Sequence, residues 1–226
     1  MKLALFDVDG TLLDSQHLIH AGLSQTLTQM GRPLQDRTEM LSVVGLSLDQ
    51  AMKRLLGEET GAAEIERAAA IYRRAFHALL DDPAYASPLF PGARDVITTL
   101  HRREDVVLGI ATGKSRRGVD RILEGFGWQD VFATIQTADD APSKPDPAMV
   151  LQAAREVGVV PADTIMIGDT SFDIAMGRAA GATTVGVAWG NHPVAVLREA
   201  AADHIIDDFA QLVPLVDALK VPEPHE

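Results

Sequence analysis

Four short apolar runs constrain the fold of this 226-residue chain more than any other feature of its sequence. The runs are LALF at 3–6, VVLGIA at 106–111, TIMIG at 164–168 and TTVGVAW at 183–189. They are rich in β-branched residues and do not alternate with polar residues, which is typical of strands buried on both faces of a parallel sheet. Helical character is expected at 93–103, 115–126, 147–157 and 171–180. The sequence therefore predicts an α/β fold, a three-layer doubly wound parallel sheet, with a weaker strand at 204–206 and a last helix at 208–219.

The stretch from residue 15 to residue 82 interrupts this alternation of strands and helices. It contains no convincing strand and is expected to form helices at 15–30, 35–42, 47–57 and 62–80. About 65 helical residues are too many for an ordinary crossover between two strands. We therefore predict an all-helical domain at 15–82, inserted into an α/β core made of residues 1–14 and 83–226.

Composition and charge exclude several classes of protein. The chain has no cysteine, so it has no disulfide, no zinc–thiolate site and no cysteine nucleophile. Its net charge of −12 disfavours non-specific binding to nucleic acid or to anionic membranes. No apolar run reaches the roughly 18 residues that span a bilayer, and early aspartates argue against a signal peptide. We expect a soluble cytoplasmic protein, a monomer or a homodimer, that binds neither nucleic acid nor a membrane.

Two carboxylates follow the first predicted strand. Asp7 and Asp9 are two residues apart, so both side chains point to the same side of the chain, and Gly10 then permits a sharp turn before Thr11. The carboxyl ends of the strands are where open α/β sheets bind their ligands. Two anions this close repel each other unless a cation or a proton intervenes. A turn with a helix cap explains the same residue types, so the pair alone does not establish a site.

Polar groups also follow the other strands. Thr112 and Gly113 end the second run, Lys144 lies in the loop SKPDP, and Asp169 ends the run TIMIG, four residues before Asp173. Each has an ordinary explanation by itself, as a helix cap, a turn residue or a solvated charge. Their convergence on one edge of the sheet is harder to explain as coincidence, and it predicts a functional crevice there, with an anion site after the second run.

The combination of these motifs resembles the haloacid dehalogenase-like hydrolase superfamily. DVDGT at 7–11, Thr112, Lys144 in SKPDP and GDTSFD at 168–173 follow the order of its four motifs. The resemblance implies a Rossmann-like core, and the helical insert is similar to the superfamily's small cap. It also implies a Mg²⁺-dependent phosphatase that acts on a small phosphorylated metabolite. DVDGTLLDS is most similar to phosphoglycolate-phosphatase-like enzymes, which makes 2-phosphoglycolate the leading substrate; phosphosugars, nucleoside monophosphates and pyrophosphate stay open.

The resemblance also assigns catalytic and metal-binding roles. Asp7 would be the nucleophile that forms an aspartyl-phosphate, and Asp9 the general acid and base. The carboxylates of Asp7 and Asp169, with the backbone carbonyl of Asp9, would hold Mg²⁺. Because the second aspartate serves an alkoxide leaving group, its presence favours cleavage of a phosphate ester over cleavage of a carbon–halogen bond.

The remaining motif residues would bind the transferring phosphoryl group. Thr112, the backbone N–H of Gly113 and Lys144 would contact its oxygens. Asp173 would support Lys144 or a metal-bound water rather than bind the metal directly. Lys114, Arg116 and Arg117, which follow this motif, could bind a carboxylate or phosphate of a substrate, but they are expected to be solvated and are not assigned to the site. The loop at 189–192 is expected to be structural, although it lies at the edge where it could contact the cap or a substrate.

Two other functions fit the same fold. A mutase similar to β-phosphoglucomutase would need an arginine for the distal phosphate, and Leu48 stands where that arginine would be expected. A non-catalytic binding protein would be expected to have lost at least one of the motif residues, and none is lost.

Overall fold

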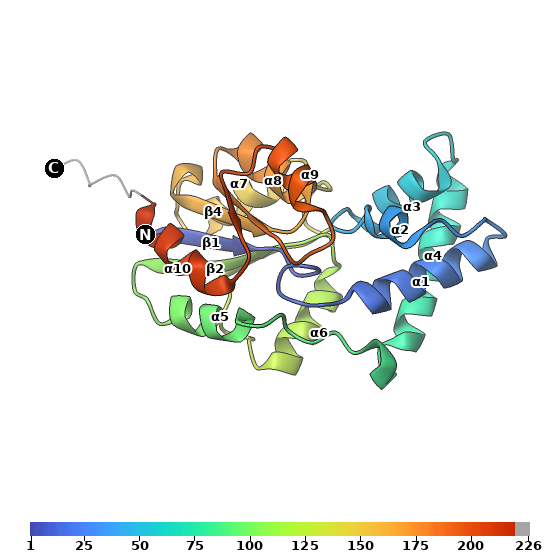
Figure 1. Ribbon diagram of the computed structural model, residues 1–226, viewed down its shortest axis with the longest axis horizontal. Helices are drawn as coiled ribbons and strands as arrows, with labels where there is room; N and C mark the ends of the chain where they lie inside the picture. The colour runs from blue at the N-terminus through green and yellow to red at the C-terminus, as the bar shows by residue number, and fades with distance from the viewer. Residues whose placement is uncertain (220–226) are drawn as a thin grey trace.

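The computed structural model describes residues 1–219, in which one sheet of parallel strands forms the centre of the molecule (Figure 1). The six strands lie in the order β3-β2-β1-β4-β5-β6. They are β1 (Lys2–Phe6), β2 (Val106–Ala111), β3 (Thr134–Gln136), β4 (Thr164–Gly168), β5 (Thr183–Val187) and β6 (His204–Ile206). From β1 the chain moves outward through β2 and β3, then returns to β4 on the other side of β1. The direction of winding therefore changes between β1 and β4, which is where such sheets bind ligands.

The apolar runs form strands because both faces of the sheet are covered. All five residues of β1 are buried, and alternate residues pack on opposite faces. Ala4 and Phe6 belong to one hydrophobic cluster, whereas Leu3 and Leu5 belong to another. The absence of polar alternation in these runs is explained by this two-sided burial.

Helices form the two outer layers. One face is covered by α5 (Ala93–His101), α6 (Arg116–Phe126) and α10 (Leu212–Ala218), and the other by α7 (Ala148–Glu156), α8 (Ser171–Ala180) and α9 (Val194–Glu199) (Figure 1). The predicted three-layer, doubly wound α/β fold is confirmed. Within residues 1–219, no helix combines the length and the apolar composition that crossing a bilayer requires.

Short or polar elements depart from the sequence prediction. The edge strand β3 was not expected, because its three residues, TIQ, carry two polar side chains. The six-residue helix α9 was also missed. β5 ends at Val187 rather than at residue 189, and the expected last helix is divided into a 3₁₀ turn, Phe209–Gln211, and α10. From the sequence we also predict that the tail at 221–226 is frayed, and this tail lies outside the described residues.

Four helices between β1 and α5 form a unit beside the carboxyl edge of the sheet, here called the cap (Figure 1). They are α1 (Gln16–Gln29), α2 (Arg37–Leu41), α3 (Leu48–Leu56) and α4 (Ala62–Leu79). The cap has its own hydrophobic cluster, in which Leu23, Leu27 and Met52 are buried. This separate cluster supports the proposed division into a domain at 15–82 and an α/β core.

The side chain of His192 joins the cap to the core. The backbone N–H of Ser171 donates to Nδ1 of the imidazole at 3.1 Å, which leaves Nε2–H to donate to the carbonyl of Ser42 in the cap, also at 3.1 Å. A second bond runs from the backbone N–H of Ser47 in the cap to Oγ of Ser143 in the core, at 2.8 Å. The loop at 189–192 therefore contacts the cap, and both nitrogens of His192 are used only when the ring is neutral.

The His192 bridge predicts a pH-dependent free energy of unfolding. Burial lowers the pKa of His192 below its ordinary value of 6.5, so the unfolded chain binds this proton first as the pH falls. His192→Gln is expected to lose about 1–2 kcal/mol at about pH 8, with a gap that narrows toward about pH 5 as the wild type loses the bridge. Urea denaturation across this range measures the gap. The exposed His77→Gln is the matched control, and a constant gap for His192→Gln would contradict the assignment.

Candidate active site

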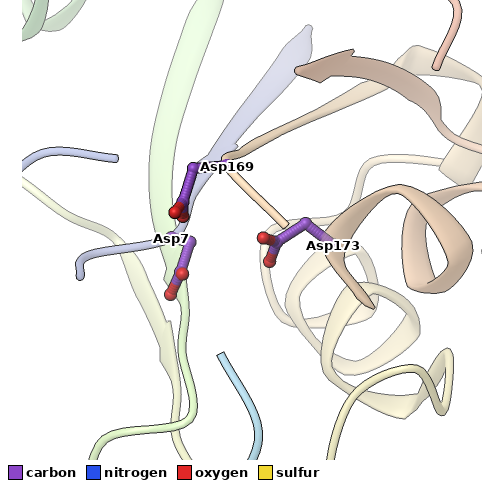
Figure 2. Close-up of side chains that lie close together, drawn as sticks. All are labelled: Asp7, Asp169 and Asp173. Carbon is purple, nitrogen blue, oxygen red and sulfur yellow. The ribbon is translucent and has the colours of Figure 1, made fainter. Parts of the chain in front are cut away.

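Three buried carboxylates converge where β1 and β4 end (Figure 2). Asp7 follows β1, Asp169 follows β4, and Asp173 lies in the first turn of α8. The two strands are paired, and the backbone N–H of Asp7 donates to the carbonyl of Ile167 at 2.9 Å. One oxygen of each carboxylate lies within 4.8 Å of the others. The parallel register thus brings together residues that are more than a hundred positions apart.

The ammonium of Lys144 compensates part of this negative charge. Its Nζ lies 2.6 Å from Oδ1 of Asp173 and 3.0 Å from Oδ1 of Asp7, and the side chain is completely buried. Burial by itself lowers the pKa of Lys144, but the charges of Asp173 and Asp7 outweigh burial and raise it. Lys144 is therefore a cation held among the carboxylates, and the loop SKPDP, which sequence reasoning selected, carries it into the site.

Both carboxylate oxygens of Asp173 accept hydrogen bonds from other residues of the protein. Oδ1 accepts from Lys144, and Oδ2 accepts from the backbone N–H of Thr170 at 3.0 Å and from its Oγ1 at 2.7 Å. The bond from the N–H of Thr170, together with a bond from the backbone N–H of Asp173 to Oγ1 of Thr170 at 3.4 Å, forms a capping box at the start of α8. Because these bonds fix Asp173, its carboxylate is suited to hold Lys144 in place.

Asp169 is fixed from two sides. Its Oδ2 accepts from the backbone N–H of Asn191 at 2.7 Å and from the Nδ2 of the same residue at 2.8 Å, while Oδ1 accepts from Oγ1 of Thr11 at 3.1 Å. Gly190 lies so close that a Cβ there would be 2.1 Å from Cβ of Asp169. Sequence reasoning did not identify Asn191 as part of the site. No spacing pattern connects it to Asp169, because the contact depends on how the loop after β5 folds back.

The oxygens of Asp7 are the least satisfied of the cluster. Both are buried, and within residues 1–219 neither accepts a hydrogen bond, so the contact with Lys144 is an ion pair only. Burial raises the pKa of Asp7 to about 6, with Lys144 opposing the rise. Burial, together with the charges of Asp173 and Asp7, raises the pKa of Asp169 to about 8. The site is therefore short of positive charge.

These properties fit a divalent metal ion. Hard cations such as Mg²⁺ prefer carboxylate and carbonyl oxygens, and a second cation would compensate the charge that Lys144 leaves. Asp7, Asp169 and Asp173 lie close enough together that each could offer a carboxylate oxygen to such an ion. Oδ1 of Asn191, buried and without a hydrogen-bond partner in the described chain, offers an acceptor beside the same site.

The turn after β2 forms another wall of the site. Thr112 is buried, and its backbone N–H donates to the carbonyl of Gln136 at 3.0 Å. A Cβ on Gly113 would lie 2.4 Å from the carbonyl oxygen of Leu46 and 2.7 Å from that of Gly45, both in the cap. Glycine is thus required at 113 because the backbone of the cap lies directly against it.

Lys114 is not solvated, and the sequence-based expectation for it was wrong. Its Nζ lies 2.9 Å from Oδ1 and 2.8 Å from Oδ2 of Asp9, whose Oδ1 also accepts from Oγ of Ser15 at 2.5 Å. Only 14% of the Lys114 side chain is exposed. The residues next to Lys114 in the sequence gave no sign of this ion pair, because its partner Asp9 is 105 residues away along the chain.

Aromatic side chains of α4 face this ion pair. The ring of Phe76 lies 5.4 Å from Nζ of Lys114, and the ring of Tyr72 packs 5.6 Å from that of Phe76. Burial, assisted by the charge of Asp9, raises the pKa of the Tyr72 hydroxyl, which therefore stays protonated. The ion pair of Lys114 with Asp9 therefore lies against the cap.

Comparisons with known proteins agree with this geometry. The family model described as haloacid dehalogenase-like hydrolase matches residues 4–187. The chain is 31% identical to a probable phosphatase, IndB, of Dickeya dadantii, over 96% of this chain and 94% of the relative. It is 30% identical to a phosphoglycolate phosphatase of Pseudomonas putida (94% and 79% covered) and 31% identical to the pyrophosphatase PpaX of Oceanobacillus iheyensis (96% and 97%).

Solved structures show the same fold. A hydrolase from Pseudomonas syringae superposes with a TM-score of 0.85 at 26% sequence identity, covering 98% of this chain and 100% of the other. The likeness therefore includes the cap as well as the sheet.

The hydrogen bonds from Asn191 to Asp169 predict that Asn191 affects the affinity of the site for Mg²⁺. Asn191→Ala removes the Nδ2 bond to Asp169 and is expected to weaken Mg²⁺ binding about 10-fold or more, because Asp169 is then less firmly oriented. Isothermal titration of the purified protein with Mg²⁺ measures this. Gln16→Ala is the control, since Gln16 bonds the carbonyl of Gly190 in the same loop without touching Asp169. Equal Mg²⁺ affinity in wild type and Asn191→Ala would refute the role.

Proposed function

The chain belongs to the haloacid dehalogenase-like hydrolase family and is a phosphatase, and from this premise we propose that it hydrolyses a small-metabolite phosphomonoester, with 2-phosphoglycolate as the leading substrate. Because the chain is a phosphatase, the alternative of a non-catalytic binding protein with the same fold is rejected. One observation carries the proposed mechanism. Asp7 is buried beside Lys144, and both of its carboxylate oxygens lack hydrogen bonds within the described residues, so that the group is free to react.

Asp7 is proposed as the nucleophile of the first step. Its neighbours Asp169 and Asp173 are tied to Asn191 and Thr170, whereas its own oxygens are not. An oxygen of Asp7 attacks phosphorus, the bond from phosphorus to the ester oxygen breaks, and the leaving oxygen takes a proton from Asp9. The products of this step are an aspartyl-phosphate at Asp7 and the free alcohol.

The second step uses the same two residues. Asp9 removes a proton from a water molecule, the water oxygen bonds to phosphorus, and the bond between phosphorus and Asp7 breaks. Inorganic phosphate leaves, and both aspartates return to their starting forms. Ser15 and Lys114 hold the carboxylate of Asp9 in place for both proton transfers.

Charge on the phosphoryl group is proposed to be balanced from two sides. Lys144, Oγ1 of Thr112 and the backbone N–H of Gly113 are placed at the carboxyl edge to contact its oxygens. Asp7, Asp169 and the backbone carbonyl of Asp9 would hold Mg²⁺. When bound, the ion would neutralise charge on the phosphoryl oxygens and on the two carboxylates.

The mutase alternative gains no support from the cap. Leu48, the residue in place of the arginine that would bind a distal phosphate, packs against the hydrophobic cluster of the cap. A leucine held there offers no donor to a second phosphate. Hydrolysis therefore remains the proposed outcome, because water can resolve the aspartyl-phosphate without a bound phosphosugar intermediate.

Substitution of Asp7 tests the proposed function. Asp7→Asn keeps the shape of the side chain but removes the nucleophile, and it is expected to lower phosphate release by at least about a thousandfold. The assay uses 2-phosphoglycolate, glucose 6-phosphate, a nucleoside monophosphate and pyrophosphate, each with Mg²⁺, and 2-phosphoglycolate is expected to give the highest kcat/KM.

Asp163→Asn provides the matched control for this test. Asp163 is a buried aspartate at the opposite end of β4, directly before the strand begins, so its substitution is expected to leave kcat unchanged. Circular dichroism verifies that both variants fold. Normal turnover by Asp7→Asn would rule out Asp7 as the nucleophile. Similar kcat/KM values for all four substrates would contradict the proposed preference for 2-phosphoglycolate.

A further inference from the structure

Lys114 positions Asp9, the proposed general acid and base, but this role does not use all of its hydrogen-bond donors. Its ammonium group carries three N–H donors, and within residues 1–219 its side-chain hydrogen bonds both go to the oxygens of Asp9. One donor therefore remains available. Only 14% of the side chain is exposed and the ring of Phe76 in the cap lies 5.4 Å from Nζ, so the ammonium lies between the core and the cap rather than in open solvent.

The position of Asp9 determines where the leaving group lies. Asp9 gives a proton to the leaving oxygen, so that oxygen must come within about 2.6–3.2 Å of the Asp9 carboxylate. Nζ of Lys114 is 2.8–2.9 Å from the same carboxylate. The first few atoms beyond the leaving oxygen therefore lie within reach of Lys114.

Lys114 is the positively charged side chain bonded to Asp9, beside which the leaving group would lie. The side of α4 nearest the ion pair presents the rings of Phe76 and Tyr72, which offer apolar surface and one protonated hydroxyl. Asp7, Asp169 and Asp173 lie at the base of the site and repel a second anion. An anionic leaving group can be accommodated only where a cation offsets this field, and Lys114 supplies that cation beside Asp9.

We propose that Lys114 is a specificity residue that binds a negative charge located two or three bonds from the leaving oxygen. The chemical class is a phosphate ester or anhydride whose leaving group carries such a charge, either the carboxylate of a small 2-hydroxy acid or the phosphate released from pyrophosphate. Esters with a neutral leaving group gain nothing from this ammonium. The inference deepens the proposed function and depends on it, because it assumes that Asp9 protonates the leaving oxygen.

The test compares matched esters on Lys114 variants. 2-Phosphoglycolate and 2-hydroxyethyl phosphate have leaving groups of similar size that differ in charge, and pyrophosphate supplies the second kind of anion. Because Lys114 also positions Asp9, Lys114→Gln is expected to lower kcat for both esters by a similar factor. It is expected to raise KM about 10- to 100-fold for 2-phosphoglycolate but less than about 3-fold for 2-hydroxyethyl phosphate. Lys114→Arg keeps the charge and is expected to retain the preference for an anionic leaving group.

Controls separate this inference from the proposed function. Arg117→Gln removes an exposed positive charge three residues along the chain and is expected to leave kcat/KM for both esters unchanged.

Equal losses of kcat/KM on the charged and the neutral ester in Lys114→Gln would show that Lys114 only positions Asp9, and would overturn the proposal. Wild-type turnover with no preference for a charged leaving group would also overturn it. Wild-type protein that hydrolyses none of the esters would instead overturn the proposed function, and this inference with it. A loss in Lys114→Gln for pyrophosphate alone would identify phosphate, rather than carboxylate, as the bound anion.

Discussion

The buried ammonium of Lys144 is the interaction on which the rest of the site depends. It lies between Asp7 and Asp173, and its side chain has no exposed surface. Carboxylates that are buried together cannot all remain charged without compensation, and removal of one partner from a buried ion pair costs about 3–5 kcal/mol. The capping box at α8 fixes Asp173, Asp173 fixes Lys144, and Lys144 faces Asp7. Within the described residues the oxygens of Asp7 accept no hydrogen bond, and their ion pair is with Lys144, which Asp173 holds in place.

The parallel sheet and the cap divide the work of building the site. Strand ends supply the charges, because β1 and β4 lie side by side where the direction of winding changes. The cap supplies enclosure: its carbonyls press against Gly113, its aromatic rings face Lys114, and Ser42 receives the hydrogen bond from His192. Enclosure raises the strength of each electrostatic contact because water is excluded from the space where the phosphoryl group would transfer.

Sequence reasoning identified what depends on local pattern and missed what depends on long-range contact. The apolar runs of β1, β2 and β4 were found because burial on both faces leaves a clear composition, whereas the three residues of β3 carry too little signal. Asp7, Lys144 and Asp169 were selected because each follows a strand or lies in a rigid loop. Asn191 and the ion pair of Lys114 with Asp9 were not foreseen, since both join segments whose proximity is established only by the fold.

The measurement that tests the central claim most directly is mass spectrometry of acid-quenched enzyme during turnover. Asp9→Asn slows the attack of water, and p-nitrophenyl phosphate has a leaving group that does not need the proton of Asp9. With this variant, this ester and Mg²⁺, one phosphoryl group is expected on the peptide that contains Asp7. The absence of that label from every peptide, while phosphate is still released, would show that water attacks phosphorus directly. A label on Asp169 or Asp173 would show that the wrong carboxylate has been assigned as the nucleophile.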